Sequence, residues 1–576
     1  MVSYAEFTEI DEFERLIADF RAGAVDEETF RSRRLAMGTY GIRQSDTHMI
    51  RVKVPGGSLA PQHLEALADI ADRYSRGFGH ITTRQNFQFH FVQLDDVPAL
   101  MRRIAEAGMT TREACGNTIR NVTQSELAGI DPTELVDTRA AMETTVQYFL
   151  RHPAFQSLPR KFKIAFDGSS ADRAQLGIHD VGALGTVGPD GGTGFQVFVG
   201  GGLGSTPREA DLLEPFTPSA RFLPTVEAIL EVFNEHGERK NRVRARMKYL
   251  LNKWGIDKFR EEVFARRERL EAEVDYPPLV LPRREPAPVL SRRPEPTDEL
   301  EGEAAEAFRR WRDVNVFAHE GPAADEPRFG AFLTFHLGDV TSEQFRRLAK
   351  VWTELGAQVE LRTTIRQNLL FTNLTGEQLS HLYATLRDGG MDLARAEKSG
   401  DIVSCPGAET CNLALTASRG LGDAVTDALV AAGLDEIENL RINISGCPNA
   451  CGQHTSADLG FSGMARRDPS GNEAPGYRIY VGARLDAGGV KFGHYVSKVP
   501  AKKAPEVAVE IVGRYAAERA SGESFADWVA RVTPDQLKAD LKVHDTMPSL
   551  EEDPAFYADW GMSRQFEVIL GRGECA

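Results

Sequence analysis

The sequence predicts an α+β fold, rich in α/β units, in which two halves are related by pseudo-twofold symmetry. An internal repeat is the first observation, because the block from Arg84 to Phe89 recurs from Arg366 to Phe371. Each copy follows the pattern of a strand and an amphipathic helix, over 50–74 and 332–355. A segment dense in proline and charge, 276–296, separates the copies. A ligand site between the halves is expected, since sites at domain interfaces collect loops from both sides.

Two further blocks recur in the same order along the chain. We expect 115–121 to correspond to 405–412, and 194–200 to correspond to 476–482. Matched blocks in one order are hard to attribute to chance. The second half should therefore repeat the fold of the first.

Composition and charge narrow the class of protein. The 576 residues are enough for several domains, and no run approaches the ~20 apolar residues of a membrane span. The first nine residues contain no basic segment followed by an apolar one, and six cysteines are too few for a disulfide scaffold. A net charge of −16 argues against broad nucleic-acid binding. We expect a cytoplasmic protein, with no membrane or nucleic-acid partner, that binds small anions or another protein.

The chain opens with helical patterns over 5–36, followed by a strand at 48–54 and a helix at 61–74. Phe87 and Phe89 then alternate with polar residues, which predicts a half-buried strand. Its polar face would carry Arg84, Gln88 and His90.

A basic stretch, 239–270, precedes the proline-rich segment and predicts one long helix. A solvated helix face is the simplest interpretation of such a charge run. Part of a docking surface for an acidic electron donor is the alternative.

Four of the six cysteines lie in two short loops. They are Cys405, Cys411, Cys447 and Cys451. Such a cage holds a [4Fe–4S] cluster or a structural zinc ion. Five residues separate the first pair, more than the two to four that are usual between zinc ligands, so the spacing favours the cluster over zinc and over an unliganded core.

With these loops and the blocks at 49–57, 82–85, 117–121, 158–163 and 194–203, the chain resembles the sirohaem- and [4Fe–4S]-containing assimilatory sulfite/nitrite reductase family. The resemblance implies a three-lobed architecture with the cofactors at the interface of the lobes. The expected parts are an N-terminal helical segment (1–45), paired ferredoxin-like half-domains forming one lobe (46–125 and 325–398), a first sirohaem and substrate lobe (126–275), a proline-rich linker (276–324), a [4Fe–4S] and sirohaem lobe (399–545) and a C-terminal tail (546–576).

The resemblance also implies which residues hold the cofactors. All four cysteines bind the cluster, and Cys451 also ligates the sirohaem iron. The sirohaem carboxylates need cationic and amide partners. The positions that match family sirohaem contacts are Thr82, Arg84, Gln88, Gln367 and Asn449.

Four cations match the family's active-site residues, namely Arg51, Arg120, Lys161 and Lys163. Two lysines at alternate positions of a strand point to one side. Without the resemblance this segment would be assigned to a surface strand. With it, the four form an anion clamp that binds substrate, stabilises charge and relays protons.

The implied reaction is the six-electron reduction of sulfite to sulfide. Lys163 favours sulfite, because plant-type nitrite reductases of the family tend to have asparagine there and sulfite carries more negative charge than nitrite. Reduction of nitrite to ammonium is the first alternative. A non-catalytic iron–sulfur or zinc protein is the second.

The two remaining cysteines have simpler interpretations. A lone cysteine such as Cys115 is usually a small buried hydrophobe. Some family sulfite reductases carry a cysteine at this position cross-linked to a tyrosine, and Tyr40 is the candidate partner. Cys575 is expected to be a free terminal thiol.

The electron source must be external to this chain. The sequence contains no second cluster motif and no glycine-rich fingerprint that opens a βαβ unit. Ferredoxin or a separate flavoprotein subunit is therefore the expected donor.

Overall fold

The computed structural model describes residues 2–295, 300–321, 326–486, 489–569 and 571. Two antiparallel helices begin the chain, and α1 packs against α4. Their bounds are α1 (Phe7–Arg21), α2 (Glu27–Ala36) and α4 (Val97–Glu106). Acidic N-caps and basic last turns match the helix dipole in α1 and α2. No helix of the described part is long and apolar enough to cross a membrane.

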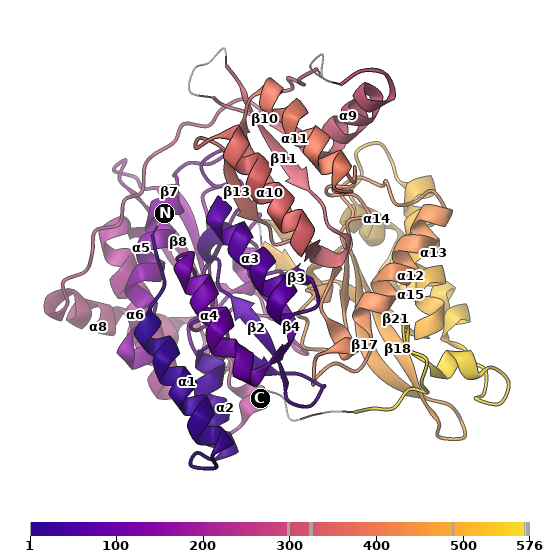
Figure 1. The fold of residues 1–576 in the computed structure, drawn as a ribbon, viewed down its shortest axis with the longest axis horizontal. Coiled ribbons are helices and arrows are strands. Elements are labelled where there is room, and N and C mark those ends of the chain that lie inside the picture. The colour runs from indigo at the N-terminus through magenta and orange to yellow at the C-terminus, as the bar shows by residue number, and fades with distance from the viewer. Residues whose placement is uncertain (1, 296–299, 322–325, 487–488, 570, 572–576) are drawn as a thin grey trace.

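One lobe is built from both halves of the chain (Figure 1). Its first sheet has the order β1-β2-β4-β3-β12 and its second the order β10-β11-β14-β13. The strands of the first sheet are β1 (Thr39–Gly41), β2 (Thr47–Val52), β3 (Phe78–Ile81), β4 (Phe87–Gln93) and β12 (Asp339–Thr341). Those of the second are β10 (Val316–His319), β11 (Arg328–Leu333), β13 (Glu360–Thr363) and β14 (Leu369–Leu374). Strand β12 comes from the second half of the chain but pairs with β3 in the first sheet, so this sheet contains strands from both halves.

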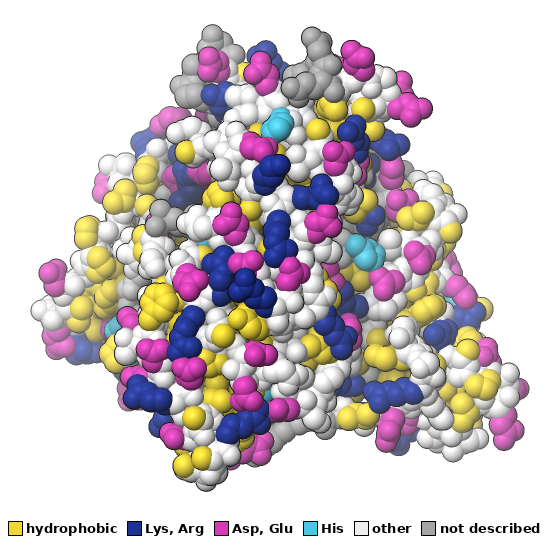
Figure 2. All heavy atoms as spheres, viewed as in Figure 1, with side chains coloured by type: hydrophobic (Ala, Val, Ile, Leu, Met, Phe, Trp, Pro, Cys, Tyr) yellow, Lys and Arg dark blue, Asp and Glu magenta, His cyan; other side chains and the backbone are white. Residues whose placement is uncertain are grey.

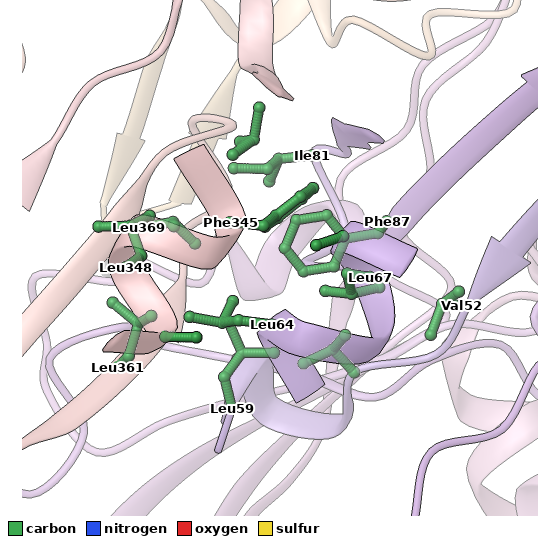
Figure 3. Packing of buried hydrophobic residues seen from close by; sticks show 14 of the residues in the cluster. Val52, Leu59, Leu64, Leu67, Ile81, Phe87, Phe345, Leu348, Leu361 and Leu369 are labelled. Carbon is green, nitrogen blue, oxygen red and sulfur yellow. The ribbon is translucent and has the colours of Figure 1, made fainter. Parts of the chain in front are cut away.

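Helices α3 (Pro61–Tyr74) and α10 (Ser342–Leu355) lie side by side at the centre of this lobe, and α9 (Gly302–Asn315) and α11 (Gly376–Asp388) flank the second sheet. Figure 3 shows the core that they share, where Leu64 and Leu67 face Phe345 and Leu348. The Phe87 and Phe345 rings meet edge to face, with their centroids 5.4 Å apart. Burial of these apolar side chains holds the two half-domains against each other.

Two mixed sheets form the other lobes, and their strands follow the same order. These orders are β5-β6-β7-β8-β9 and β15-β16-β17-β18-β21, each parallel over its first three strands and antiparallel afterwards. The first sheet contains β5 (Thr123–Gln124), β6 (Ile164–Asp167), β7 (Val181–Val187), β8 (Thr193–Val199) and β9 (Asp211–Pro218). The second contains β15 (Val403–Ser404), β16 (Ile442–Ser445), β17 (Leu459–Arg467), β18 (Glu473–Val481) and β21 (His494–Pro500). The small hairpin β19 (Arg484–Asp486) and β20 (Gly489–Lys491) follows β18.

Helices cover each mixed sheet. Those of the first lobe are α5 (Arg139–Phe149), α6 (Ser219–His236), α7 (Met247–Trp254) and α8 (Ile256–Glu273). Those of the second are α12 (Ser418–Ala431), α13 (Ala504–Glu518), α14 (Phe525–Val532) and α15 (Pro534–Asp540). Each lobe has its own buried hydrophobic cluster, so each carries a separate core.

Two glutamines of the repeated block join the halves by equivalent hydrogen bonds. The Gln85 amide donates to the Thr363 carbonyl at 2.9 Å, and the Gln367 amide donates to the Ile81 carbonyl at 2.9 Å. Both side chains are buried, and both have positive φ, at 58° and 64°. The predicted duplication is thus present at the level of single hydrogen bonds.

Several predictions about individual elements are wrong. The block 115–121 precedes β5, whereas 405–412 follows β15, so these blocks are not equivalent. The linker predicted over 276–324 ends earlier, because α9 and β10 lie within it and belong to the second half-domain. The helix predicted over 239–270 is divided at Gly255, whose φ of 77° ends α7.

Strand β4 is buried on both faces, so the prediction of a half-buried strand is also wrong. Gln88 and His90 are only 6% and 9% exposed. On this polar face Gln88 lies opposite Arg51 of the neighbouring strand β2 and accepts hydrogen bonds from its guanidinium group.

Candidate functional site

The four cysteines lie in two loops at the ends of neighbouring parallel strands. Cys405 directly follows β15, and Cys447 follows β16, with which β15 pairs. Since the carboxyl ends of parallel neighbours meet at one edge of a sheet, loops 405–411 and 447–451 come together. Gly407 has a φ of 63°, and a Cβ at Gly446 would lie 2.5 Å from the Thr416 carbonyl, so both positions require glycine.

The thiols influence one another, which indicates that they face a common space. Burial raises the pKa of Cys411 to about 11 and also raises that of Cys405 and Cys447, and nearby Cys451 adds to each shift. Gly446 N–H donates to Cys405 Sγ at 3.3 Å. A positively charged iron cluster would stabilise these groups as thiolates, so the donor set fits such a cluster.

A single bound metal ion needs several side-chain ligands arranged around one point. Over the described residues, no group of three or more His, Cys, Asp or Glu side chains is arranged to hold one ion.

Arg51 and Arg120 are held by the backbone of one loop. Arg51 donates to the Ala114 carbonyl at 3.1 Å, and Arg120 donates to the same carbonyl at 3.2 Å and to Gly116 at 2.8 and 2.9 Å. With its amide oriented to satisfy its neighbours, Gln88 accepts two hydrogen bonds from Arg51. These carbonyl partners fix the orientation of both guanidinium groups.

Lys161 and Lys163 flank Phe162, which is fully buried and forms a parallel β-bridge with Ile119. Alternation about this buried residue carries both ammonium groups to the other side of the segment. Burial lowers the pKa of Lys163 well below its ordinary value, and the neighbouring cations Arg84, Arg246 and Lys161 lower it further. Burial likewise lowers the pKa of Arg84 to about 9, with Arg120 as the next cause. The structure therefore brings the predicted cations into one cluster.

Three charged residues of this cluster were missed by the sequence analysis. Asp180 is fully buried and pairs with Arg246 at 2.9 Å, and Lys248 donates to the carbonyls of the 202–206 loop. Arg246 and Lys248 belong to the basic stretch that was assigned to a solvated face. The internal repeat held a signal for Asp180, because Asp180-Val-Gly182 recurs as Asp458-Leu-Gly460.

The cation cluster and the cysteine cage meet at one hydrogen bond. The Thr83 hydroxyl donates to the Cys451 carbonyl at 3.0 Å, joining the 82–85 loop of the first half to the last cysteine of the second. Cys451 is exposed, whereas the other three cysteines are buried or half-buried. Within the described residues, Arg84 Nε is buried without a hydrogen-bond partner. The Arg84 Nη2 group donates to the Asn121 carbonyl, so only Nε is left over. An exposed thiol together with this buried Nε donor fits a second cofactor that brings both a metal and carboxylates.

The remaining predicted cofactor contacts lie in different surroundings. Thr82 accepts from the N–H groups of its own turn at 3.3 and 3.1 Å, and Asn449 is exposed in the Cys447 loop. The Gln367 amide is occupied by Ile81, Ser404 and His80, so it lies at the junction of the halves rather than in the cation cluster.

Tyr40 is part of the cation cluster. Its hydroxyl accepts from Arg120 at 3.3 Å, and Arg51 lies over its ring at 5.4 Å. Cys115 is fully buried in the loop whose carbonyls hold both arginines. Cys575 lies outside the described residues.

Positive charge is clustered in this site without an equal number of carboxylates. On the face shown in Figure 2, Lys and Arg side chains are interspersed with Asp and Glu. The cation cluster is therefore a local concentration of base within a molecule whose net charge is −16.

These features define a class, namely internally duplicated redox proteins in which a four-cysteine cage borders a buried cation site. The nitrite and sulphite reductase 4Fe-4S domain model matches residues 115–273 and 396–547. The nitrite/sulfite reductase ferredoxin-like half domain model matches residues 40–107 and 326–389. The chain belongs to the nitrite and sulfite reductase family.

Individual relatives agree with this assignment. A sulfite reductase (ferredoxin) of Mycobacterium tuberculosis (strain ATCC 25618 / H37Rv) is 30% identical over 85% of this chain and 83% of its own. An assimilatory ferredoxin-dependent nitrite reductase of Haloferax mediterranei is also 30% identical, over 86% of this chain and 83% of its own. The solved structure of the Mycobacterium tuberculosis NirA protein superposes with a TM-score of 0.76 at 26% identity, covering 92% of this chain and 95% of that one.

The family assignment confirms the main sequence-based predictions. The chain is an oxidoreductase of the sulfite and nitrite reductase type with a duplicated α+β fold. Its cofactors are a [4Fe–4S] cluster and a sirohaem. The alternative of a non-catalytic iron–sulfur or zinc protein is not supported.

Proposed function

We propose that this chain is an assimilatory sulfite reductase that receives electrons from ferredoxin and reduces sulfite to sulfide. The contact of Thr83 with Cys451 carries the proposal, because it sets a buried cluster of cations beside the exposed cysteine of the cage. An anion held by these cations would lie next to the electron source.

Each residue set has a role in this proposal. Cys405, Cys411, Cys447 and Cys451 would hold the cluster, and Cys451 would also be a ligand of the sirohaem iron. Thr82, Arg84, Gln88 and Asn449 would bind sirohaem carboxylates, whereas Gln367 positions the Cys405 loop through Ser404. When bound, the sirohaem and cluster supply an open iron site and one-electron transfers.

The chain's own cations bind and orient the substrate. Backbone carbonyls of the 114–116 loop fix the orientation of Arg51 and Arg120, and two guanidinium groups oriented in this way would attract the oxygens of an anion. The Lys163 ammonium has a lowered pKa in the free site, and a bound anion raises it again because opposite charge favours the protonated form. Lys163 therefore takes up a proton with the substrate and can donate it as an oxygen leaves as water.

Sulfite is favoured over nitrite by the number of clustered cations. Sulfite carries more negative charge than nitrite near neutral pH, and a buried lysine matches that extra charge. The relatives include proteins named for either anion, so nitrite remains the second candidate substrate.

The absorption spectrum of the purified protein and its turnover test this proposal. We expect sirohaem bands that shift on addition of sulfite, and a higher kcat/KM for sulfite than for nitrite with a reduced dye as donor. Reduced ferredoxin should replace the dye. A protein with iron but no sirohaem, or with faster nitrite turnover, would contradict the proposal, and reduction only by a flavoprotein subunit would overturn the choice of donor.

A further inference from the structure

Asp180 and Asp458 occupy the same position in the two mixed sheets. Each lies directly before the third strand, β7 or β17, and each accepts the backbone N–H of the residue directly before the second strand. The hydrogen bond from the Lys163 N–H to Asp180 is 3.0 Å long, and the one from the Arg441 N–H to Asp458 is 2.9 Å long. The carbonyl of each aspartate also accepts from the glycine that follows the fourth strand, at 3.0 and 2.8 Å.

The side chains that neutralise these aspartates differ. In the second half, Arg441 turns back and pairs with Asp458, with Nε to Oδ2 at 2.9 Å. Its backbone and its side chain thus bind the same carboxylate. In the first half, Asp180 pairs with Arg246, which directly precedes α7.

The second half has a serine where the first has Arg246. Ser524 directly precedes α14, as Arg246 directly precedes α7, and both short helices follow the long helix of their lobe. The Ser524 hydroxyl donates to Asp527 at 2.6 Å and caps its own helix. A guanidinium therefore reaches the buried aspartate from this position in the first half only.

We propose that Arg246 is a positioning residue, which pairs with Asp180 and thereby keeps the Lys163 ammonium out of an ion pair, leaving it for the substrate anion. The inference rests on the proposed function, since it assumes that Lys163 binds this anion. Among the described residues, no carboxylate oxygen lies within 4 Å of the Lys163 ammonium, whereas Asp180 Oδ2 accepts from its backbone N–H.

Burial makes this choice of partner consequential. The Asp180 side chain is fully buried and that of Arg246 is 11% exposed. A buried carboxylate that loses its partner must find another or become protonated. Lys163 is the adjacent cation, since its backbone N–H already donates to Asp180. It occupies the position equivalent to Arg441, whose side chain pairs with Asp458. Removal of Arg246 should therefore lead the Lys163 ammonium to pair with Asp180, as Arg441 pairs with Asp458.

The test is sulfite binding to the purified holoenzyme, followed by the shift of its sirohaem absorption. Arg246→Gln should raise the sulfite Kd about tenfold, as expected for loss of one cation from a binding site. The affinity of the reduced enzyme for carbon monoxide, a neutral ligand, should stay within about twofold. Arg467→Gln, a surface arginine 71% exposed and paired with Glu473, is the matched control and should change neither.

Two backgrounds separate this mechanism from a simple loss of positive charge. In the D180N background, Arg246→Gln should have little effect, because no carboxylate remains to capture Lys163. In the K163M background it should also have little effect, because no ammonium remains to be captured. A tenfold effect that persists in K163M would show that Arg246 acts on the anion directly and would overturn the proposal.

The remaining outcomes distinguish this proposal from the proposed function. Equal loss of sulfite and carbon monoxide binding in Arg246→Gln would indicate a distorted site and would contradict the positioning role. If Arg246→Gln does not fold, Arg246→Lys is used in its place, because lysine keeps the positive charge. Its sulfite affinity is then compared with those of the wild type and of D180N. A wild-type protein that holds sirohaem but binds no sulfite would refute the proposed function instead.

Discussion

The two halves of this chain share a fold but use equivalent loop positions for different chemistry. Cys405 directly follows β15, whereas Ser125 directly follows β5. Cys447 lies two residues after β16, and Ser169 lies two residues after β6. In the first half, Ser169 shares a 2.6 Å hydrogen bond with Thr133. A hydrogen-bonded loop cluster thus occupies the place that the thiol cage takes in the second half.

The cations show the opposite division. Lys163 and Arg441 directly precede equivalent strands, but only Arg441 forms an ion pair with the neighbouring aspartate, Asp458. In the first half Arg246 pairs with Asp180 instead, which leaves the Lys163 ammonium for the substrate anion. The comparison teaches that a duplicated scaffold can separate two functions, electron supply in one half and anion binding in the other. The strand order remains common to both.

The largest expected effect comes from breaking the thiol cage. Cys451→Ala should abolish sirohaem retention and lower turnover more than about 1,000-fold, since even outer-shell partners of a metal ligand contribute about 10–100-fold. Iron and sirohaem content measure the loss. Ser169→Ala, in the half without thiols, is the control and should keep both cofactors; full sirohaem retention in Cys451→Ala would remove the bridging role.

The next effect concerns the spared lysine. Lys163→Asn should lower kcat/KM for sulfite about 100-fold and that for nitrite less than about tenfold, because sulfite depends more on the extra positive charge. Steady-state rates with a reduced dye decide this. Equal losses for the two anions would remove the argument for sulfite.

A pH profile tests the lowered pKa of Lys163. Sulfite binding needs the ammonium form, so affinity should be high below the lowered pKa and fall as pH rises through it. Arginine keeps its proton up to much higher pH, so Lys163→Arg should shift this fall upward. The measurement is the sulfite Kd as a function of pH for both proteins, in which the titration of sulfite itself contributes equally. Superimposable profiles would exclude Lys163 as the titrating group.

The smallest effect concerns the glutamines that are alike in both halves. Gln85→Ala and Gln367→Ala should each lower the free energy of unfolding by about 2–3 kcal/mol, because buried backbone groups lose their partners. Denaturant titration measures this. Gln367 also binds the backbone of Ser404, next to Cys405, so only Gln367→Ala should lower the cluster content as well. Identical cluster contents would argue that the two glutamines are fully interchangeable.

Much of the architecture follows from local sequence patterns. The strand and helix that precede Arg84 and Arg366 were predicted because hydrophobic periodicity is a property of neighbouring residues. The spacing of Cys405, Cys411, Cys447 and Cys451 favoured an iron–sulfur cluster for the same reason. The match of 115–121 with 405–412 is wrong because it was based on a cysteine and an asparagine that both blocks contain. The first block lies before its strand, β5, whereas the second lies after the equivalent strand, β15.

Local sequence patterns are enough to predict the duplication, the cysteine loops and the lysines on either side of Phe162, because each pattern lies in residues close together along the chain. Three contacts between distant residues are known from the three-dimensional fold alone, namely the pairing of Arg246 with Asp180, the pairing of β12 with the sheet of the other half, and the hydrogen bond of Thr83 with Cys451. The physical reason is that ion pairs and strand pairs between distant residues depend on which surfaces the cores bring together. Periodicity along the chain carries no information about that choice.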